Sequence, residues 1–220
     1  MDSWRLWIGK NDTTFSWSGL TCNMLIRKAI SLGASDARMI PIDQVHVDPS
    51  IVELCVSPRC SGYAQCANCP PFVMDPQTAK RWITNYNEAL LLKKDFDPFD
   101  LLAHDHMEHF REMFLMVTAM ERLAMKRGFK DAAALGAGSC KPVFCPERDC
   151  AVLEGKPCPY PHLARPSLEA LGINVFDLAK KVGWQMYKIL RETDPNTVPS
   201  ASLVGMVLLA KQPNTGGTSR

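Results

Sequence analysis

The stretch Cys55–Pro71 reads CVSPRCSGYAQCANCPP and spaces its four cysteines as C-x4-C-x5-C-x2-C. A second stretch, Cys140–Cys158, reads CKPVFCPERDCAVLEGKPC and spaces its four as C-x4-C-x4-C-x7-C. Eight of the nine cysteines therefore fall in two short segments. Both segments are also rich in proline, which fixes the backbone and interrupts helices and strands. We therefore expect two rigid loops, set between the elements of a folded domain.

Metal ligation explains this clustering best. Disulfide bonds would need an oxidising compartment, and the opening MDSWR lacks the apolar core of a secretory signal. Buried structural thiols would follow a helix or strand period, which these spacings do not. Two groups of four match the four thiolates of a Cys₄ zinc site or a [4Fe–4S] cluster. The sequence predicts a cytoplasmic protein that binds metal through Cys55, Cys60, Cys66, Cys69, Cys140, Cys145, Cys150 and Cys158.

The spacing favours iron over zinc. Structural zinc sites typically use pairs of C-x₂₋₄-C knuckles, and neither stretch consists of two knuckles with a long spacer. Each is one continuous run, which suits a wide cluster better than a single ion. Cys69 and Cys158 are each followed by proline, as is the last cysteine of the bacterial ferredoxin run. We predict one or two [4Fe–4S] clusters, with zinc as the alternative cofactor.

Hydrophobic periodicity predicts an α+β fold. With 220 residues, 46% of them hydrophobic, the chain is long enough for one domain with a real core. We expect a small mixed sheet, flanking helices and the two cysteine-rich loops at one end of the sheet. The domain is expected over 23–210, with an N-terminal arm over 1–22 and a disordered tail over 211–220. Helices are predicted over 23–32, 76–87, 106–128, 167–171 and 174–182, and extended segments over 38–46, 51–55, 89–93, 131–136 and 202–209.

The charge balance excludes some partners. The chain has 25 Lys and Arg against 23 Asp and Glu, a net charge of +2, which does not suit a strongly basic nucleic-acid binder. No apolar run approaches the roughly 18 residues of a membrane span. We expect neither nucleic acid nor a membrane span. The cations nearest the cysteines either complement anionic thiolates or are ordinary surface charges: Arg59, Lys141, Arg148, Lys156 and Arg165.

Several motifs occur in a fixed order around the cysteines. They are Cys55-x4-Cys60-x2-Tyr63, Cys69-Pro70-Pro71, Gly138-Ser139-Cys140, Gly155-Lys156-Pro157-Cys158 and the run RPSLEALGINV over 165–175. In these motifs the chain, from about 23 to 209, resembles the DUF2284 predicted metal-binding proteins, which are found mainly in anaerobic bacteria and archaea.

The resemblance implies metal binding and names no reaction. It implies six ligands: Cys55, Cys60, Cys69, Cys140, Cys150 and Cys158. Whether Cys66 and Cys145 ligate stays open, because Cys66 has no clear counterpart and the stretch from Cys140 to Cys150 is longer than the family pattern. Ala64 also follows Tyr63 where the family usually has glycine.

Three functions are compatible with these observations. The leading hypothesis is an iron–sulfur protein of anaerobic metabolism, either an electron carrier or an accessory subunit with a redox protein as its partner, rather than a stand-alone enzyme. The second is a zinc-stabilised protein-interaction module. The third is an enzyme whose cluster leaves one iron free of protein ligand, which would follow if only three cysteines of one group ligate.

Overall fold

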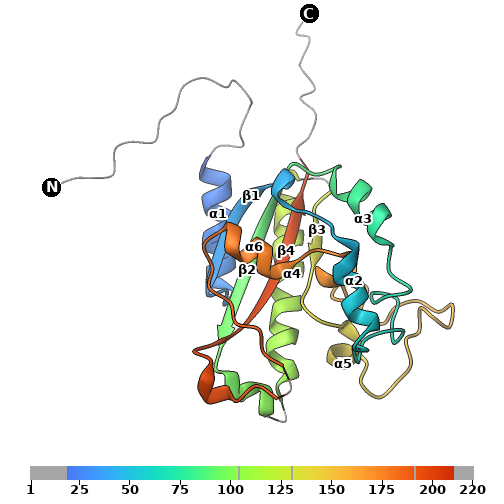
Figure 1. Cartoon of the computed structure of the whole chain (residues 1–220). Coiled ribbons are helices and arrows are strands. Elements are labelled where there is room, and N and C mark those ends of the chain that lie inside the picture. Colours follow the sequence, from blue (N-terminus) through green and yellow to red (C-terminus); the bar gives the residue numbers. More distant parts are fainter. Residues whose placement is uncertain (1–18, 104, 130, 191, 211–220) are drawn as a thin grey trace, which may run out of the picture.

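An antiparallel sheet of four strands forms the centre of the structure, a computed structural model that describes residues 19–210 except 104, 130 and 191 (Figure 1). Its spatial order is β1-β2-β4-β3. The strands span Asp36–Pro41 (β1), Glu88–Phe96 (β2), Ala133–Leu135 (β3) and Ala201–Leu209 (β4). With helices on both sides of this sheet, the predicted α+β fold is confirmed.

The pairing corrects one detail of the prediction, because the sheet is antiparallel throughout rather than mixed. The long helix α4 (Met107–Lys126) connects β2 to β3, and these two strands run in the same direction. They would form a parallel pair if they were adjacent. Instead, β4 lies between them and runs opposite to both.

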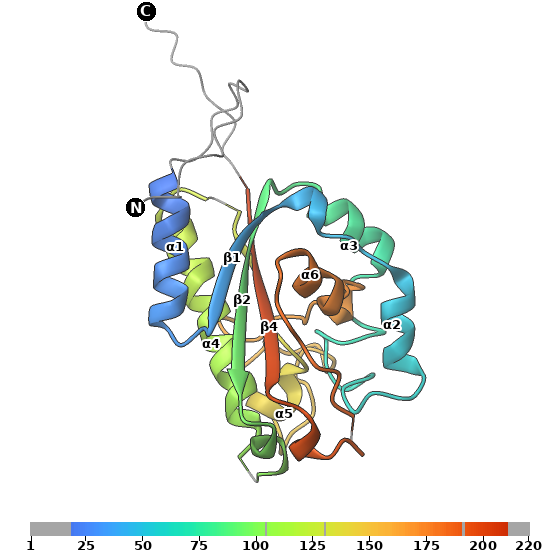
Figure 2. The same cartoon turned by 60° about the vertical axis from the view of Figure 1, so that its left-hand side comes forward.

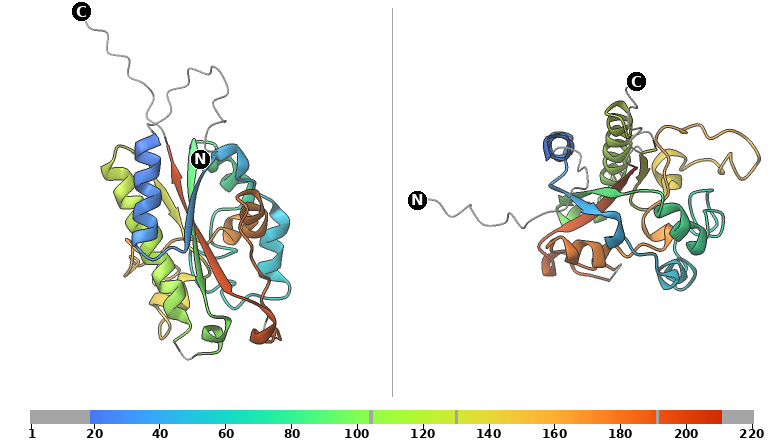
Figure 3. Two further views of the ribbon diagram at one scale, coloured as in Figure 1. Left: turned by 90° about the vertical axis from the view of Figure 1, so that its left-hand side faces the viewer. Right: turned by 90° about the horizontal axis from the view of Figure 1, so that it is seen from above.

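Helices cover both faces of the sheet (Figure 2 and Figure 3). On one face, Leu90 and Leu92 of β2 pack in a core with α1 (Gly19–Ser31) and α4. On the other face, Ala89 and Leu91 pack in a second core with residues of α3 (Pro76–Ile83) and α6 (Val175–Lys181). A strand buried on both faces needs apolar residues at successive positions, and ALLL in β2 has this pattern.

The helix α2 (Pro49–Val56) corrects a second prediction, because residues 51–55 are helical and not extended. Asp48 caps this helix: its side chain accepts a hydrogen bond from the Ser50 amide, and Pro49 takes the first helical position. Proline is favoured there because its missing N–H would have no partner within the helix. α2 carries Cys55 into the first cysteine loop.

The other predicted elements correspond to observed ones, except that the segment predicted as extended over 38–46 is a strand only as far as Pro41 and is helical over 42–44. Helices predicted over 23–32, 76–87, 106–128 and 174–182 appear as α1, α3, α4 and α6, and the one over 167–171 as the short turn η3 (Glu169–Leu171). The structure adds α5 (Cys140–Phe144), η1 (Ile42–Gln44), η2 (Pro98–Leu102) and η4 (Pro195–Thr197). The predicted arm, up to residue 18, and the predicted tail lie outside the described residues. None of the helices in the described part combines the length and the apolar character of a membrane span.

A third, smaller core lies beneath the cysteine loops. It contains Cys66, Cys69 and Cys140 together with Phe114 of α4 and Phe144 of α5. The rings of Phe114 and Phe144 meet edge to face with centroids 5.4 Å apart. Because α4 also packs on the sheet, this helix connects the loops to the main body of the fold.

Candidate metal centre

The two cysteine loops meet at Ser139 and three buried sulfur atoms. Cys66 Sγ and Cys140 Sγ are 3.8 Å apart. Ser139 Oγ lies 3.3 Å from Cys69 Sγ and 3.6 Å from Cys66 Sγ. The side-chain amide of Asn68 donates to Cys140 Sγ at 3.5 Å. Residues that are more than 70 positions apart in the chain therefore form one cluster of sulfur atoms.

Five of the eight thiols line one cavity of about 230 Å³, which we call the five-thiol cavity. Four of them are the cysteines of the second stretch, and the fifth is Cys66, which contacts Cys140 at the loop junction. Phe144 and Tyr160 contribute to the wall as a stacked pair, with ring centroids 5.3 Å apart. The five cysteines are Cys66, Cys140, Cys145, Cys150 and Cys158.

The remaining three thiols, Cys55, Cys60 and Cys69, line a second cavity of about 390 Å³, the three-thiol cavity. Ser139 and Glu169 also contribute to its wall. The grouping in space therefore differs from the grouping in sequence. Cys66 belongs to the first stretch but faces the same cavity as all four cysteines of the second stretch.

Hydrogen bonds among the buried thiols shift their pKa values in opposite directions. The Cys140 and Cys69 thiols lower the pKa of Cys66 by hydrogen bonding to its sulfur. The same bonds, reinforced by burial, raise the pKa of Cys69 and of Cys140. The contacts therefore favour a thiolate within this group of three, and the thiolate is the form that binds metal.

The three-thiol cavity carries a carboxyl group with a perturbed pKa. Burial raises the pKa of Glu169. Burial also raises the pKa of the Cys55 thiol, and the negative charges of Cys60 and Glu169 add to this effect. A bound cation would reverse this balance, because it favours the charged form of every neighbouring anion.

Backbone N–H groups point at two of the more accessible sulfur atoms. The Gly62 amide donates to Cys60 Sγ and the Tyr160 amide donates to Cys158 Sγ, each at 3.4 Å. Gly62 also passes close to the loop junction, since a Cβ there would lie 3.0 Å from Ser139 Cβ and 3.3 Å from Cys69 Sγ. N–H donors to cysteine sulfur tune the potential of iron–sulfur sites.

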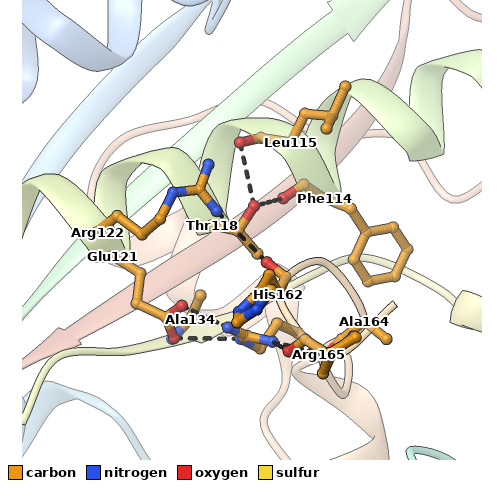
Figure 4. A network of polar contacts seen from close by, with 10 residues as sticks. Phe114, Leu115, Thr118, Glu121, Arg122, Ala134, His162, Ala164 and Arg165 are labelled. Atoms are coloured by element: carbon orange, nitrogen blue, oxygen red, sulfur yellow. Dashed lines mark hydrogen bonds and ion pairs between the residues drawn. The ribbon is translucent and has the colours of Figure 1, made fainter. Parts of the chain in front are cut away.

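A buried ion pair attaches the end of the second loop to α4 (Figure 4). Arg165 donates to both carboxylate oxygens of Glu121, at 2.6 and 3.2 Å, and to the carbonyls of Pro161 and Ala164. Glu121 Oε1 also accepts from the amide of Ala134 in β3, at 2.8 Å. This network ties the segment after Cys158 to both the helix and the sheet edge.

Three of the other nearby cations have local partners. Lys141 Nζ donates to the carbonyls of Cys145 and Pro146, at 2.8 and 3.2 Å. Lys156 pairs with Glu154 at 2.7 Å, and the Arg59 guanidinium lies over the Tyr63 ring. These cations stabilise the shape of the loops. The sequence left open whether these cations complement the thiolates. The hydrogen bonds, ion pair and ring contact described for Lys141, Lys156 and Arg59 are not to sulfur atoms.

The donor set of the candidate site consists of cysteine sulfur. All nine cysteines lie in the described residues, and the structure places three of them around one cavity and five around the other. Thiolates are the ligands of both Cys₄ zinc sites and iron–sulfur clusters, so the residues present fit either group. Spacing alone did not identify Ser139 and Glu169 as wall residues, although both belong to the motifs of the family resemblance.

Comparison with known proteins supports the same chemistry. The sequence profile of the family described as predicted metal-binding protein (DUF2284) matches residues 38–209. No curated protein and no solved structure matches the chain. The matched range contains all eight clustered cysteines, β2 to β4, most of β1 and the ion pair of Glu121 with Arg165. Since the profile covers most of the sequence, the chain belongs to the DUF2284 family of predicted metal-binding proteins.

Proposed function

We propose that this protein holds [4Fe–4S] clusters on its cysteine thiolates and serves in electron transfer, as a carrier or as an accessory subunit of a redox enzyme. The observation that carries the proposal is the convergence of eight thiols from two distant loops on two adjacent cavities. Each cavity has at least three thiols. When bound, such clusters supply one-electron transfer.

The two cavities support two clusters, and the cysteines would divide between them by cavity. Cys55, Cys60 and Cys69 would hold one group. Cys145, Cys150 and Cys158 would hold the other, with the junction pair Cys66 and Cys140 available to complete it. The polypeptide would stabilise the negative charge through its amides, including those that already point at Cys60 and Cys158.

The surface around the first loop supports exchange of electrons with a partner. Cys60 is exposed. On the neighbouring helix α2, Leu54 is 62% exposed and Val56 is 52% exposed, and Phe72 follows the loop with an exposure of 52%. A contiguous patch of exposed apolar residues is typical of a contact surface. We expect a redox partner to contact these side chains and to approach the exposed Cys60.

A zinc-stabilised interaction module is the second candidate, and one distance favours it. The 3.8 Å between Cys66 Sγ and Cys140 Sγ equals the edge of a sulfur tetrahedron with Zn–S bonds of about 2.3 Å. In that arrangement the metal would supply folding free energy. The same exposed apolar residues would then contact a structural partner.

Elemental analysis with a UV–visible spectrum, on protein purified without oxygen, separates the two candidates. We expect about four or eight irons with matching sulfide and a broad band that dithionite bleaches. A colourless protein with one or two zincs would contradict the iron–sulfur proposal. The variants Cys69→Ser and Cys22→Ser form a matched pair. Cys69 lines a cavity and Cys22 belongs to α1, so only the first should lose metal.

A further inference from the structure

The three-thiol cavity is larger than its cysteines explain. Besides the first loop, its wall includes residues of β4, of α6 and of the irregular segment 186–189. Most of this wall is apolar or aromatic, with Phe96, Phe110 and Phe176 among its residues. Cavities of about 300–1,000 Å³ with apolar walls and a few polar groups are typical small-molecule sites, and a volume of about 390 Å³ falls in this range.

The charge of the wall restricts what the cavity can accept. The thiols of Cys55, Cys60 and Cys69 and the carboxyl of Glu169 are its ionisable acids, apart from the phenols of two tyrosines. None of the described residues in its wall is Lys, Arg or His. An anion would therefore enter without a compensating positive charge, whereas a cation or a neutral hydrogen-bond donor would find acceptors. Leaving a charge unpaired in an apolar cavity is costly.

The number of thiols also leaves room for a ligand from outside the chain. A [4Fe–4S] cluster takes four ligands, and three cysteines line this cavity while the other five line its neighbour. The wall of this cavity would therefore supply three of the four ligands to such a group.

We propose that the three-thiol cavity is a binding site for a small, mostly apolar molecule that is neutral or cationic, with its polar end at Glu169. This inference rests on the proposed function for the identity of the metal group. The charge and shape of the wall, however, come from the protein itself. Ligand binding and iron content are therefore separate measurements.

Fluorine NMR tests the proposal on anaerobically purified full-length protein. The probes are para-fluorobenzylamine, a cation, para-fluorobenzyl alcohol, which is neutral, and para-fluorophenylacetate, an anion of similar size. We expect the lines of the amine and the alcohol to broaden with protein while the line of the carboxylate stays sharp. A line that broadens equally for all three probes, or for none, overturns the proposal.

A pair of neighbouring variants locates the binding. Ile189 lines the cavity, whereas Leu190 is 49% exposed and does not. Ile189→Trp fills the cavity and should weaken amine binding about tenfold or more, while Leu190→Trp should leave it unchanged. Equal binding by both variants would show that the probe binds elsewhere.

Iron and sulfide, measured on the same samples, distinguish the failure of each idea. Full iron content without selective probe binding overturns the small-molecule site and leaves the cluster proposal in place. Selective binding with no iron or sulfide keeps the site and removes the cluster.

Discussion

Cys66 and Cys140 lie with their sulfur atoms 3.8 Å apart although 74 positions separate them in the chain. Their contact joins the two cysteine loops, and Ser139 Oγ adjoins it at 3.6 Å from Cys66 Sγ. Both cysteines face the five-thiol cavity. The thiols therefore divide by cavity and not by stretch of sequence, and this division is open to measurement.

The first prediction concerns the cavity that Cys66 serves. Cys66→Ser and Cys150→Ser should each remove about half of the iron, and the double variant should remove no more, because residues that act at one site are not additive. Combining Cys66→Ser with Cys60→Ser should remove nearly all of it. Iron and sulfide analysis after anaerobic purification provides the measurement. If the iron lost by the double variant equals the sum of the losses in the two single variants, the division by cavity is wrong.

The second prediction concerns the ion pair that holds the second loop. The side chain of Glu121 is 8% exposed and that of Arg165 is 21% exposed. Arg165→Ala leaves a buried carboxylate without its partner and should lower the free energy of unfolding by about 3 kcal/mol. Chemical denaturation of the metal-free protein measures the loss.

Arg122→Ala is the matched control for this change. Arg122 lies one residue from Glu121 on α4, is exposed, and donates to the His162 carbonyl at 3.4 Å (Figure 4). Its loss should change the free energy of unfolding by less than about 0.5 kcal/mol. Equal losses for both arginines would mean that the ion pair does not stabilise the loop.

The third prediction concerns Ala64, whose φ of 60° is in the left-handed region. Its amide donates to the Pro70 carbonyl at 2.8 Å, which holds the loop in this conformation. A left-handed conformation costs an ordinary residue roughly 1–2 kcal/mol and costs glycine little. Ala64→Gly should therefore raise the free energy of unfolding by about 1 kcal/mol.

Ala67→Gly tests the same substitution in the same loop at a residue without positive φ. It should destabilise by roughly 0.5–1 kcal/mol, because glycine loses more backbone entropy on folding. Opposite signs for the two variants, from denaturation curves, would support the conformational explanation. Destabilisation by both would contradict it.

The fourth prediction concerns Gly136, which leads from β3 into the second loop. A Cβ there would lie 2.4 Å from the ring of Phe114, so Gly136→Ala should destabilise by about 1–3 kcal/mol. Combining it with Phe114→Leu, which makes space, should cost less than the sum of the two single changes. Additive losses would show that the steric contact is not the cause.

The fifth prediction concerns the cap of α2. Hydrogen bonds from Ser50 lower the pKa of Asp48. A carboxyl whose pKa is lower in the folded state stabilises the fold above its unfolded pKa of about 3.9, and this stabilisation is lost as the pH falls through the folded value. The wild type should therefore lose more stability than Asp48→Asn between about pH 5 and pH 2. The measurement is chemical denaturation of both proteins at several pH values. If their free energies of unfolding fall equally between pH 5 and pH 2, the role of the cap is contradicted.

Local patterns explain which helices and strands could be predicted. Asp75-Pro76 begins α3, and the same cap and proline at Asp48-Pro49 begin α2. The stretch 51–55, which is apolar except for Glu53, suits a strand as well as a short helix, so its pattern alone did not separate the two. The position of β4 between β2 and β3 depends on contacts between distant segments, so the direction of the pairs could not be predicted.

The same limit applies to the candidate site. Clustering and spacing predicted eight thiol ligands, because ligands of one metal group are often close in sequence, and the structure places all eight of these cysteines on the two cavities. Nothing in the local pattern separates Cys66 from Cys69, yet the two face different cavities. Glu169 lies outside both cysteine stretches and reaches the thiols only through the fold of η3.

The central position of β4 has a consequence for biosynthesis. Ala201–Leu209 follows both cysteine loops in the chain, yet it makes the hydrogen bonds that join β3 to β2. Both cysteine loops are therefore translated before the described sheet can close. During that interval the segments that carry Cys66 and Cys140 lack the completed sheet on which they come together.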